Sequence, residues 1–227
     1  KKLQCIGCKA VVSMHYGNER LLNYLENNGM PAIVVMNKNF QNKFYSVCVD
    51  NFQGAWEGSS FLLDLGHRNI LYIDFQRSDL PLLSSDRFIG FKKALDERGI
   101  EFPEENKVFY NPEDRNQCRN NLKVLFKSSN PPTAIFCLDD DVAGRAISLL
   151  AEMGLNVPGD VSVIAPGDVL DYSMPYVPRI TTMRIDTTYL GRITAQMMIN
   201  RLTHNPEEVH VLKVKQQLVR RGSCREI

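Results

Sequence analysis

Three consecutive carboxylates follow an apolar run near the middle of the chain. Residues 134–138 read Ala-Ile-Phe-Cys-Leu, and Asp139, Asp140 and Asp141 come directly after them. The apolar run has the composition of a buried strand, and the residues after the acids have the spacing of a helix. Carboxylates in this place can hold a metal, transfer protons, accept hydrogen bonds from a polar ligand, or cap the helix at the positive end of its dipole. We expect one of the three acids to be a cap and another to face a ligand.

The segments that must position these acids alternate between strand-like and helical patterns. Strand-like runs fall at residues 9–14, 31–37, 44–50, 69–74, 108–111, 134–138, 161–166 and 209–223. Helical patterns fall directly after the three acids and at residues 18–29, 51–66, 85–99, 117–129 and 187–202. Because helices alternate with continuously apolar strands, we predict an α/β fold with parallel sheets flanked by helices.

Ligands of open α/β sheets bind at the carboxyl ends of the strands. The three acids directly follow such a strand end. The same edge is predicted to carry Asn37, Asp50, the segment before Arg87, and residues 167–168. The sequence therefore gathers polar side chains where a small ligand would bind.

Length, charge and hydropathy limit the class of protein. The chain has 227 residues, enough for one large domain or two small lobes. A net charge of +1 gives no basic surface of the kind that binds nucleic acid by charge alone. No apolar run reaches the roughly 20 residues that span a bilayer, and residues 1–14 do not read as a signal peptide. We expect no membrane partner.

Six cysteines are present, too few for the disulfide framework of a small secreted protein. We therefore expect a reducing, cytoplasmic location. Cys5 and Cys8 have C-x-x-C spacing, but no second pair stands at the distance of a zinc finger, and no strand precedes them as in a redox site. The three acids have no obvious companion ligands elsewhere in the sequence. We expect no metal and no cofactor.

Catalytic motifs are missing from the sequence. His67 follows Gly66 at the end of a predicted helix, where a histidine stabilises the helix dipole, so we expect a structural role for it. No Gly-x-Ser-x-Gly, Walker or dinucleotide-binding glycine pattern is present. The sequence therefore predicts a protein that is not an enzyme.

Five patterns, in order along the chain, together resemble a known family. They are VCVDNFQGAWEGSSFLLDLGHRNILYI, SSDRFIGFKKALDERGI, FCLDDDVAGRAISLLAEMGLNVPGDVSVIAPGD, PRITTMRIDTTYLGRITAQMMINRL and LVRRGSC. Taken together, they resemble the effector-binding domain of lactose-repressor (LacI/GalR) family transcription regulators. Arabinose-repressor-like regulators carry the same domain with a different DNA-binding head. The resemblance runs from about residue 9 to residue 224.

The resemblance implies a two-lobed, periplasmic-binding-protein-like fold with three crossings between the lobes. A small ligand, usually a sugar or a purine, would be held between them. The N-terminal lobe would be residues 1–45 plus 185–207, incomplete at its start because the family's first strand, helix and second strand have no counterpart here. The C-terminal lobe would be residues 46–178 plus 209–222. The family's DNA-binding head is absent from this chain.

The resemblance also implies a set of ligand-binding residues. Arg87 matches the family arginine that reaches ligand hydroxyls, for which a guanidinium offers five donors. Asp139 falls where the family has an asparagine or aspartate that faces the cleft, so helix capping suits Asp140 or Asp141 better. Asn37 stands where many sugar binders have a charged residue. Asp168 follows the position of the family's ligand-contacting aspartate by one residue.

Departures from the family pattern bear on the ligand. Gly167 occupies the position of the contacting aspartate, so either Asp168 turns toward the ligand or the contact is lost. Ile185 stands where a glutamine is frequent, and Glu113 falls near the family's stacking aromatic, with Tyr110 close by. Fewer polar groups than in a ribose- or galactose-type cleft suggest a different or less polar ligand.

The resemblance implies a ligand-sensing domain of a DNA-binding transcriptional repressor. An effector, a sugar by first expectation, would bind between the lobes and shift DNA affinity through their orientation. The expected partners are this effector, operator DNA bound through a head outside the chain, and a second copy of the chain in a homodimer. The alternative is a periplasmic sugar-binding protein of a transporter, and an enzyme on this scaffold is a third hypothesis.

Overall fold

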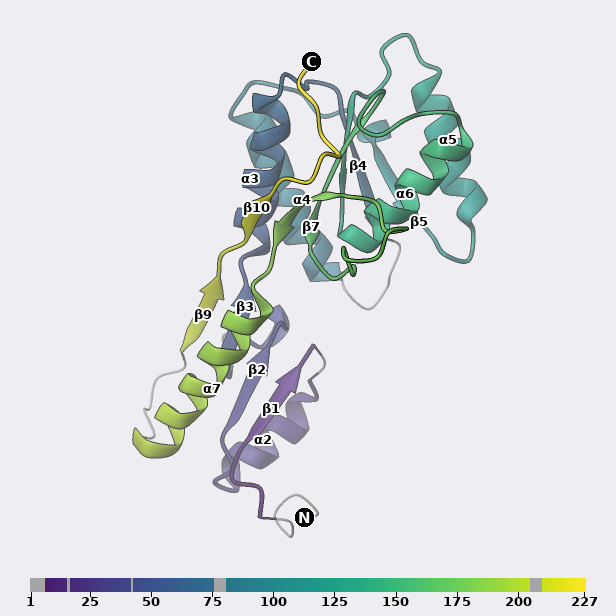
Figure 1. Cartoon of the computed structure of the whole chain (residues 1–227). Helices are drawn as coiled ribbons and strands as arrows, with labels where there is room; N and C mark the ends of the chain where they lie inside the picture. The colour runs from purple at the N-terminus through teal and green to yellow at the C-terminus, as the bar shows by residue number, and fades with distance from the viewer. Residues whose placement is uncertain (1–6, 16, 42, 76–80, 205–209) are drawn as a thin grey trace. The chain divides into compact units, whose positions relative to one another are not determined.

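The computed structural model in Figure 1 describes residues 7–15, 17–41, 43–75, 81–204 and 210–227, and for residues 81–85 only the backbone. The chain divides into two compact units. The first is Lys1–Asp50 with Asp186–Val214, and the second is Asn51–Ile185 with Lys215–Ile227. The chain thus passes from one unit to the other three times, in agreement with the three crossings that the sequence resemblance implies.

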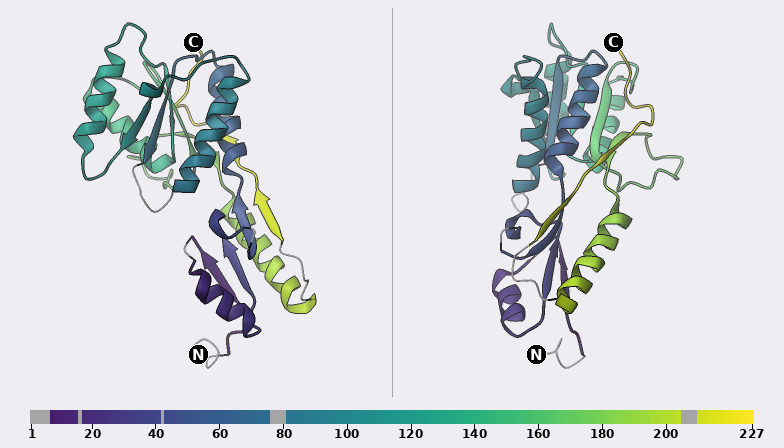
Figure 2. Two further views of the ribbon diagram at one scale, coloured as in Figure 1. Left: turned by 180° about the vertical axis from the view of Figure 1, so that it is seen from behind. Right: turned by 90° about the vertical axis from the view of Figure 1, so that its left-hand side faces the viewer.

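The first unit is built on a parallel sheet with the strand order β1-β2-β3-β9 (Figure 1). The strands are β1 (Val11–Met14), β2 (Ala32–Val35), β3 (Tyr45–Val49) and β9 (Val211–Val214). The helices are α2 (Glu19–Asn27), the 3-10 helix η1 (Lys38–Phe40) and α7 (Thr187–His204). α2 and α7 lie on opposite faces of the sheet (Figure 2), and for this reason β2 and β3 carry apolar side chains on both faces and are buried throughout.

The second unit is built on a sheet with the strand order β10-β8-β7-β6-β4-β5. The strands are β4 (Ile70–Phe75), β5 (Lys107–Tyr110), β6 (Ala134–Cys137), β7 (Ser162–Gly167), β8 (Thr181–Arg184) and β10 (Gln217–Val219). The helices are α3 (Asn51–Asp64), α4 (Pro81–Asp96), the 3-10 helix η2 (Glu104–Asn106), α5 (Arg115–Phe126) and α6 (Asp140–Glu152). β10 runs antiparallel to β8, and the other strand pairs are parallel.

Alternate residues of the central strands fill two cores in the second unit. On one face of the sheet, Leu71 and Ile135 pack in a cluster with buried residues of α5 and α6. On the other, Tyr72 and Phe136 pack in a cluster with residues of α3 and α4, as the placing of the helices in Figure 2 shows. Side chains of a strand point alternately to its two faces, so a sheet covered on both sides requires apolar residues at every position.

The units differ from those expected from the sequence by two strands, β3 and β9, which both belong to the first unit. The first unit was expected to end at residue 45, yet it keeps β3, because β3 pairs with β2 in its sheet. The run at residues 209–223 was expected to be a strand pair of the C-terminal lobe. Instead β9 pairs with β3 in the first unit, and β10 pairs with β8 in the second.

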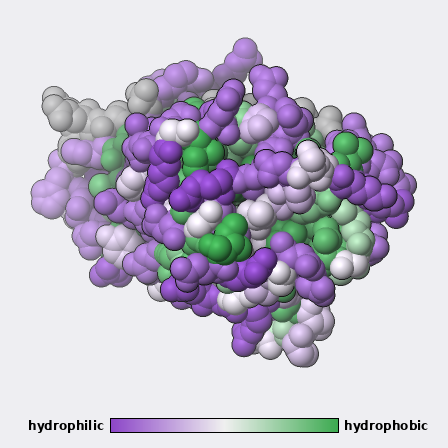
Figure 3. Space-filling view, turned by 90° about the horizontal axis from the view of Figure 1, so that it is seen from above, coloured by the Kyte–Doolittle hydropathy of each residue, from purple (hydrophilic) through white to green (hydrophobic). Residues whose placement is uncertain are grey.

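The surface is polar over most of the face seen in Figure 3, with apolar side chains in small groups between hydrophilic ones. In the part of the chain that the structure describes, no helix is both long and apolar enough to cross a membrane.

Candidate functional site

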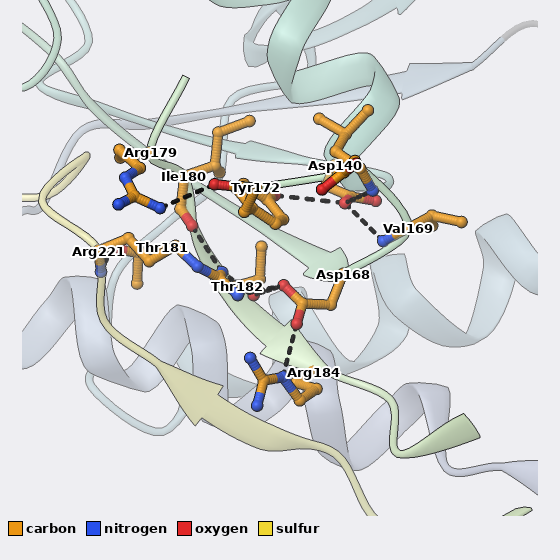
Figure 4. Close-up of polar contacts among 12 residues, drawn as sticks. Asp140, Asp168, Val169, Tyr172, Arg179, Ile180, Thr181, Thr182, Arg184 and Arg221 are labelled. Atoms are coloured by element: carbon orange, nitrogen blue, oxygen red, sulfur yellow. Dashed lines mark hydrogen bonds and ion pairs between the residues drawn. The ribbon is translucent and has the colours of Figure 1, made fainter. Parts of the chain in front are cut away.

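Parallel strands of the second unit end at one edge of its sheet, and polar residues stand at these ends. Asp74 lies next to last in β4, Asp139 and Asp140 follow β6, Asp168 follows β7, and Arg184 is the last residue of β8. We call this the carboxyl edge of the second unit, the edge at which open α/β sheets bind ligands. Figure 4 shows the part of it around Asp140 and Asp168.

Asp139 is the N-cap of α6. Its Oδ1 accepts a hydrogen bond of 2.8 Å from the backbone nitrogen of Val142, which satisfies one of the free amides of the first helical turn. The expectation that Asp140 or Asp141 would cap this helix is therefore wrong. Burial raises the pKa of Asp139 and outweighs the lowering by the Val142 amide and by Arg87. The residue is half-buried, and no described residue hydrogen-bonds its Oδ2.

Asp140 is fully buried and holds the turn after β7 (Figure 4). Its Oδ2 accepts hydrogen bonds from the backbone nitrogens of Val169 at 2.7 Å and Leu170 at 2.9 Å, and from the Tyr172 hydroxyl at 3.3 Å. Its Oδ1 is buried without a hydrogen-bond partner among the described residues. Gly167 is required beside it, since a Cβ there would lie 2.4 Å from Oδ1 and the backbone φ is +133°. Asp140 thus shapes the turn.

Asp168 is turned toward two arginines (Figure 4). Its Oδ2 lies 2.5 Å from Arg184 Nε, and its Oδ1 lies 2.5 Å from Arg221 Nη2 and 2.9 Å from Thr182 Oγ1. Burial acts to raise the pKa of Asp168, but these three hydrogen bonds together lower it. Its φ of +109° is rare for a residue with a side chain. The carboxylate is therefore engaged within the second unit.

Arg87 lies on α4 and is only 4% exposed. Its Nε donates to Asn51 Oδ1 at 3.1 Å, and its Nη1 donates to the carbonyl oxygen of Leu138 at 2.6 Å. Within the described ranges, no carboxylate is in contact with the guanidinium, and no residue accepts a hydrogen bond from Nη2. Burial lowers the pKa of Arg87, partly offset by the charge of Asp139. The guanidinium is thus held by two neutral acceptors with donors to spare.

Asn37 lies in the first unit, two residues after the end of β2. Its Oδ1 accepts from the backbone nitrogen of Asn39 at 3.1 Å and so caps η1. Its Nδ2 donates to the carbonyl oxygen of His15, after β1, at 2.7 Å. The side chain therefore joins the turns that follow two neighbouring strands. The other three residues expected to bind ligand lie in the second unit, and the structure brings Asp139, Asp168 and Arg87 to its carboxyl edge.

Tyr72 and Asp74 are buried polar residues of β4 that the sequence motifs did not single out. The Tyr72 hydroxyl has no hydrogen-bond partner among the described residues, and burial raises its pKa well above the ordinary value. Asp74 Oδ2 lies 3.4 Å from Lys107 Nζ, and that ammonium lies 4.0 Å from the centre of the Phe88 ring. Tyr72 and Asp74 could have been noticed in the sequence as polar residues inside the otherwise apolar run Ile-Leu-Tyr-Ile-Asp.

His67 is a structural residue, as expected, but it acts through burial and hydrogen bonds to other segments and not through the helix dipole. It is fully buried, with Nδ1 2.9 Å from Thr133 Oγ1 and Nε2 2.9 Å from Ser162 Oγ and 3.1 Å from the Arg225 carbonyl oxygen. Burial lowers its pKa and favours the neutral ring. Elsewhere in the described ranges, no group of three or more His, Cys, Asp and Glu side chains could hold a metal. Cys5 of the C-x-x-C pair lies outside the described residues.

The part of the sequence that forms these strands and edge residues matches the model of a known protein family. The model of the periplasmic binding protein-like domain matches residues 60–224, more than half of the chain. The chain belongs to this family. The periplasmic binding protein-like match takes in the described strands β4 to β8 and β10 and every candidate residue of the carboxyl edge.

Relatives of this periplasmic binding protein-like chain include curated transcriptional repressors. It is 32% identical to the HTH-type transcriptional repressor PurR of Pasteurella multocida over 207 residues, which are 90% of this chain and 60% of the repressor. The chain thus spans about three fifths of the length of this relative.

Solved structures with the same fold are also regulators. The chain matches a transcriptional regulator CelR–cellobiose complex with a TM-score of 0.77 and 22% identity, over 95% of this chain and 65% of the other. It matches a LacI family transcriptional regulator from Enterococcus faecium with bound ribose with a TM-score of 0.77 and 23% identity, over 100% and 83%. The resemblance to LacI/GalR effector-binding domains and the α/β fold expected from the sequence are confirmed.

Proposed function

We propose that the chain is the effector-binding part of a DNA-binding transcriptional repressor. The observation that carries the proposal is the match of 90% of the chain to a repressor at 32% identity. Effector binding would bias the conformation of the chain and thereby the DNA affinity of a head outside it. We also propose that the whole protein binds operator DNA, lies in the cytoplasm and has no enzymatic activity.

The carboxyl edge of the second unit is the proposed effector contact. Arg87 Nη2 is a donor without a described partner, and Asp139 Oδ2 is an acceptor without one. A ligand with neighbouring hydroxyls can accept from the first and donate to the second, which favours a sugar. The structures of regulators with cellobiose and with ribose support this ligand class. Asn37, in the first unit, stays a prediction, because both ends of its amide are engaged by His15 and Asn39.

Asp168 has a weaker case as a ligand contact. Two arginines and a threonine hydroxyl already engage its carboxylate, and Gly167 occupies the position of the family's contacting acid. We therefore propose that Asp168 acts on the effector site through its place in the turn. The lack of an acid at residue 167 favours ligands that need fewer acceptors than ribose- or galactose-type sugars.

Thermal unfolding in the presence of ribose, cellobiose and hypoxanthine tests the proposal. A ligand at 100 times its Kd stabilises the folded state by about 2.7 kcal/mol, which shifts the Tm by roughly 5–11 °C at this size. Asp139→Asn should abolish the shift while the helix stays capped, because asparagine caps as well as aspartate. Asp141→Asn in the same helical turn is the matched control and should keep it. A shift that survives Asp139→Asn would remove Asp139 from the site.

A homodimer is part of the proposal. By resemblance, α6 and the segment around residues 169–174 match places where subunits of the family meet, and Val169 is 82% exposed there. Sedimentation at micromolar concentration should show a dimer that Val169→Glu weakens, because a charge buried in an interface is costly. A wild-type monomer under these conditions would contradict it.

A further inference from the structure

The turn after β7 is tied to the point where the chain leaves the second unit. Arg184 ends β8, and the second passage between the units comes after Ile185. The backbone nitrogen of Ile185 donates to the carbonyl oxygen of Gly167 at 3.1 Å. One residue away on each segment, Asp168 Oδ2 accepts from Arg184 Nε at 2.5 Å (Figure 4). Two adjacent contacts thus join the carboxyl edge to this passage.

The two arginines around Asp168 are held very differently. The Arg221 side chain is 11% exposed and also donates to the Ile180 carbonyl oxygen at 2.9 Å and to Thr182 Oγ1 at 2.7 Å. Its guanidinium lies 3.9 Å from the centre of the Tyr172 ring. Arg221 is therefore fixed in place by several neighbours at once.

The side chain of Arg184, by contrast, has a single described partner. It is 47% exposed, and its only hydrogen bond among the described residues goes to Asp168. Asp168 is only 12% exposed, but the arginine side of the pair is open to water, where ion pairs are weak. A small movement of the turn would release Arg184 and leave Arg221 bound.

The turn after β7 is also held by the start of α6, which lies at the carboxyl edge. Asp140 is next to the proposed contact Asp139, and it accepts hydrogen bonds from the backbone amides of Val169 and Leu170. A ligand that moves the start of α6 therefore moves the residues next to Asp168. The chain of contacts runs from Asp139 through Asp140 and the turn to Arg184.

We propose that Asp168 is a positioning residue that couples the carboxyl edge to the second passage between the units through its ion pair with Arg184. In the ligand-free protein the pair holds Arg184 and Ile185 against the turn, and effector binding loosens this hold. The ligand-dependent part rests on the function proposed above. The ligand-free part does not.

Amide hydrogen exchange of the full chain, followed by mass spectrometry of the peptide around residues 182–188, tests the coupling. Arg184→Ala should speed exchange of this peptide about fivefold without ligand, because loss of a weak ion pair lowers the local opening free energy. Arg145→Ala is the matched control. Its side chain is 45% exposed, pairs with one carboxylate, Asp141, at 2.8 Å, and lies over the Tyr110 ring at 5.6 Å, outside the peptide that is followed. Unchanged exchange in Arg184→Ala would overturn the proposal.

A second arm uses whichever of ribose, cellobiose or hypoxanthine shifts the Tm of the wild type. That ligand should speed exchange of the peptide in the wild type. Arg184→Ala should bind it up to about fivefold more tightly, because binding no longer costs the loss of the ion pair, and should show no further change of exchange. Binding without any change of exchange in the wild type would overturn the coupling. If none of the three ligands binds, the effector proposal fails for these classes, and the ligand-free comparison still decides whether the ion pair holds β8.

Discussion

The backbone nitrogen of Val169 lies 2.7 Å from Oδ2 of the buried Asp140. A carboxylate at the start of α6 therefore holds the turn after β7 by a hydrogen bond. No cation is in contact with this carboxylate in the described part of the chain, and the donors that hold it are two amides and one hydroxyl. Each hydrogen bond of this kind contributes roughly 0.5–1.5 kcal/mol to stability. The turn and the carboxylate therefore stabilise each other.

Replacing Asp140 by alanine should destabilise the protein by about 1–3 kcal/mol, because the turn loses the acceptor of three hydrogen bonds. The free energy of unfolding in urea measures this loss. Asp141→Ala, next in the chain, removes an exposed acid paired with Arg145 and should change stability by less than about 1 kcal/mol. Equal losses in the two variants would show that Asp140 does no more than a helix-terminal acid.

A side chain at residue 167 should be poorly tolerated. Gly167→Ala places a Cβ 2.4 Å from Asp140 Oδ1 at a backbone φ of +133°, and we expect a loss of at least about 1 kcal/mol. Gly144→Ala, inside α6, meets only Leu170 Cδ1 at 3.7 Å and should stabilise by about 0.5–1 kcal/mol. Urea unfolding of both variants compares them. A stable Gly167→Ala protein would mean that the turn can move away from Asp140.

Removing the hydroxyl of Tyr72 and removing that of Tyr172 should have different effects on stability. The Tyr72 hydroxyl is buried without a described partner, so Tyr72→Phe should leave stability unchanged or raise it by up to about 1 kcal/mol. The Tyr172 hydroxyl donates to Asp140, so Tyr172→Phe should lower stability by about 0.5–1.5 kcal/mol. Calorimetric Tm values decide the order. A clear loss in Tyr72→Phe would indicate a bound water or other partner for that hydroxyl.

The buried imidazole of His67 should make the protein less stable in mild acid. Its pKa is lowered in the folded state, so between that pKa and the ordinary value of about 6.5 the unfolded chain binds more protons. The stability that the neutral ring contributes is complete above about pH 6.5 and falls as the pH decreases toward the folded pKa.

Urea unfolding at pH 7.5 and pH 5.5 measures this dependence, and His67→Gln separates it from the other titrating groups. The variant will be less stable at both pH values, but its stability should change less between them than that of the wild type. The same change in both proteins would place the pH dependence elsewhere.

The alternation of apolar and helical segments predicted the α/β class and most elements. β8 was missed because Thr181, Thr182 and Arg184 do not read as an apolar run, although the first two are buried. Their hydroxyls are satisfied by Arg221 and Asp168, which come from other parts of the chain. A single strand pattern cannot reveal partners so distant in the sequence.

The residues of the carboxyl edge were predicted better than their roles. Asp139 and Asp168 reach this edge because the end of a strand fixes the place of the residues that directly follow it. Arg87 reaches it from α4, where it donates to the carbonyl oxygen of Leu138. Which of the three acids caps α6 depends on one residue of backbone geometry, since Asp139 is extended and Asp140 is already helical. Composition does not carry that distinction. Asp168 could not be assigned because its partners Arg184 and Arg221 are brought to it by two further strands.

Gly167 and Asp140 also constrain how this sequence can change. The space that a side chain at residue 167 would need is occupied by the Asp140 carboxylate. An acid at residue 167 could therefore be gained only together with a smaller side chain at residue 140 or a changed turn, because either substitution alone passes through a less stable protein. The two positions should consequently be substituted together among relatives. An engineer who wishes to restore a ligand-binding acid at residue 167 must redesign residues 140 and 167 as a pair.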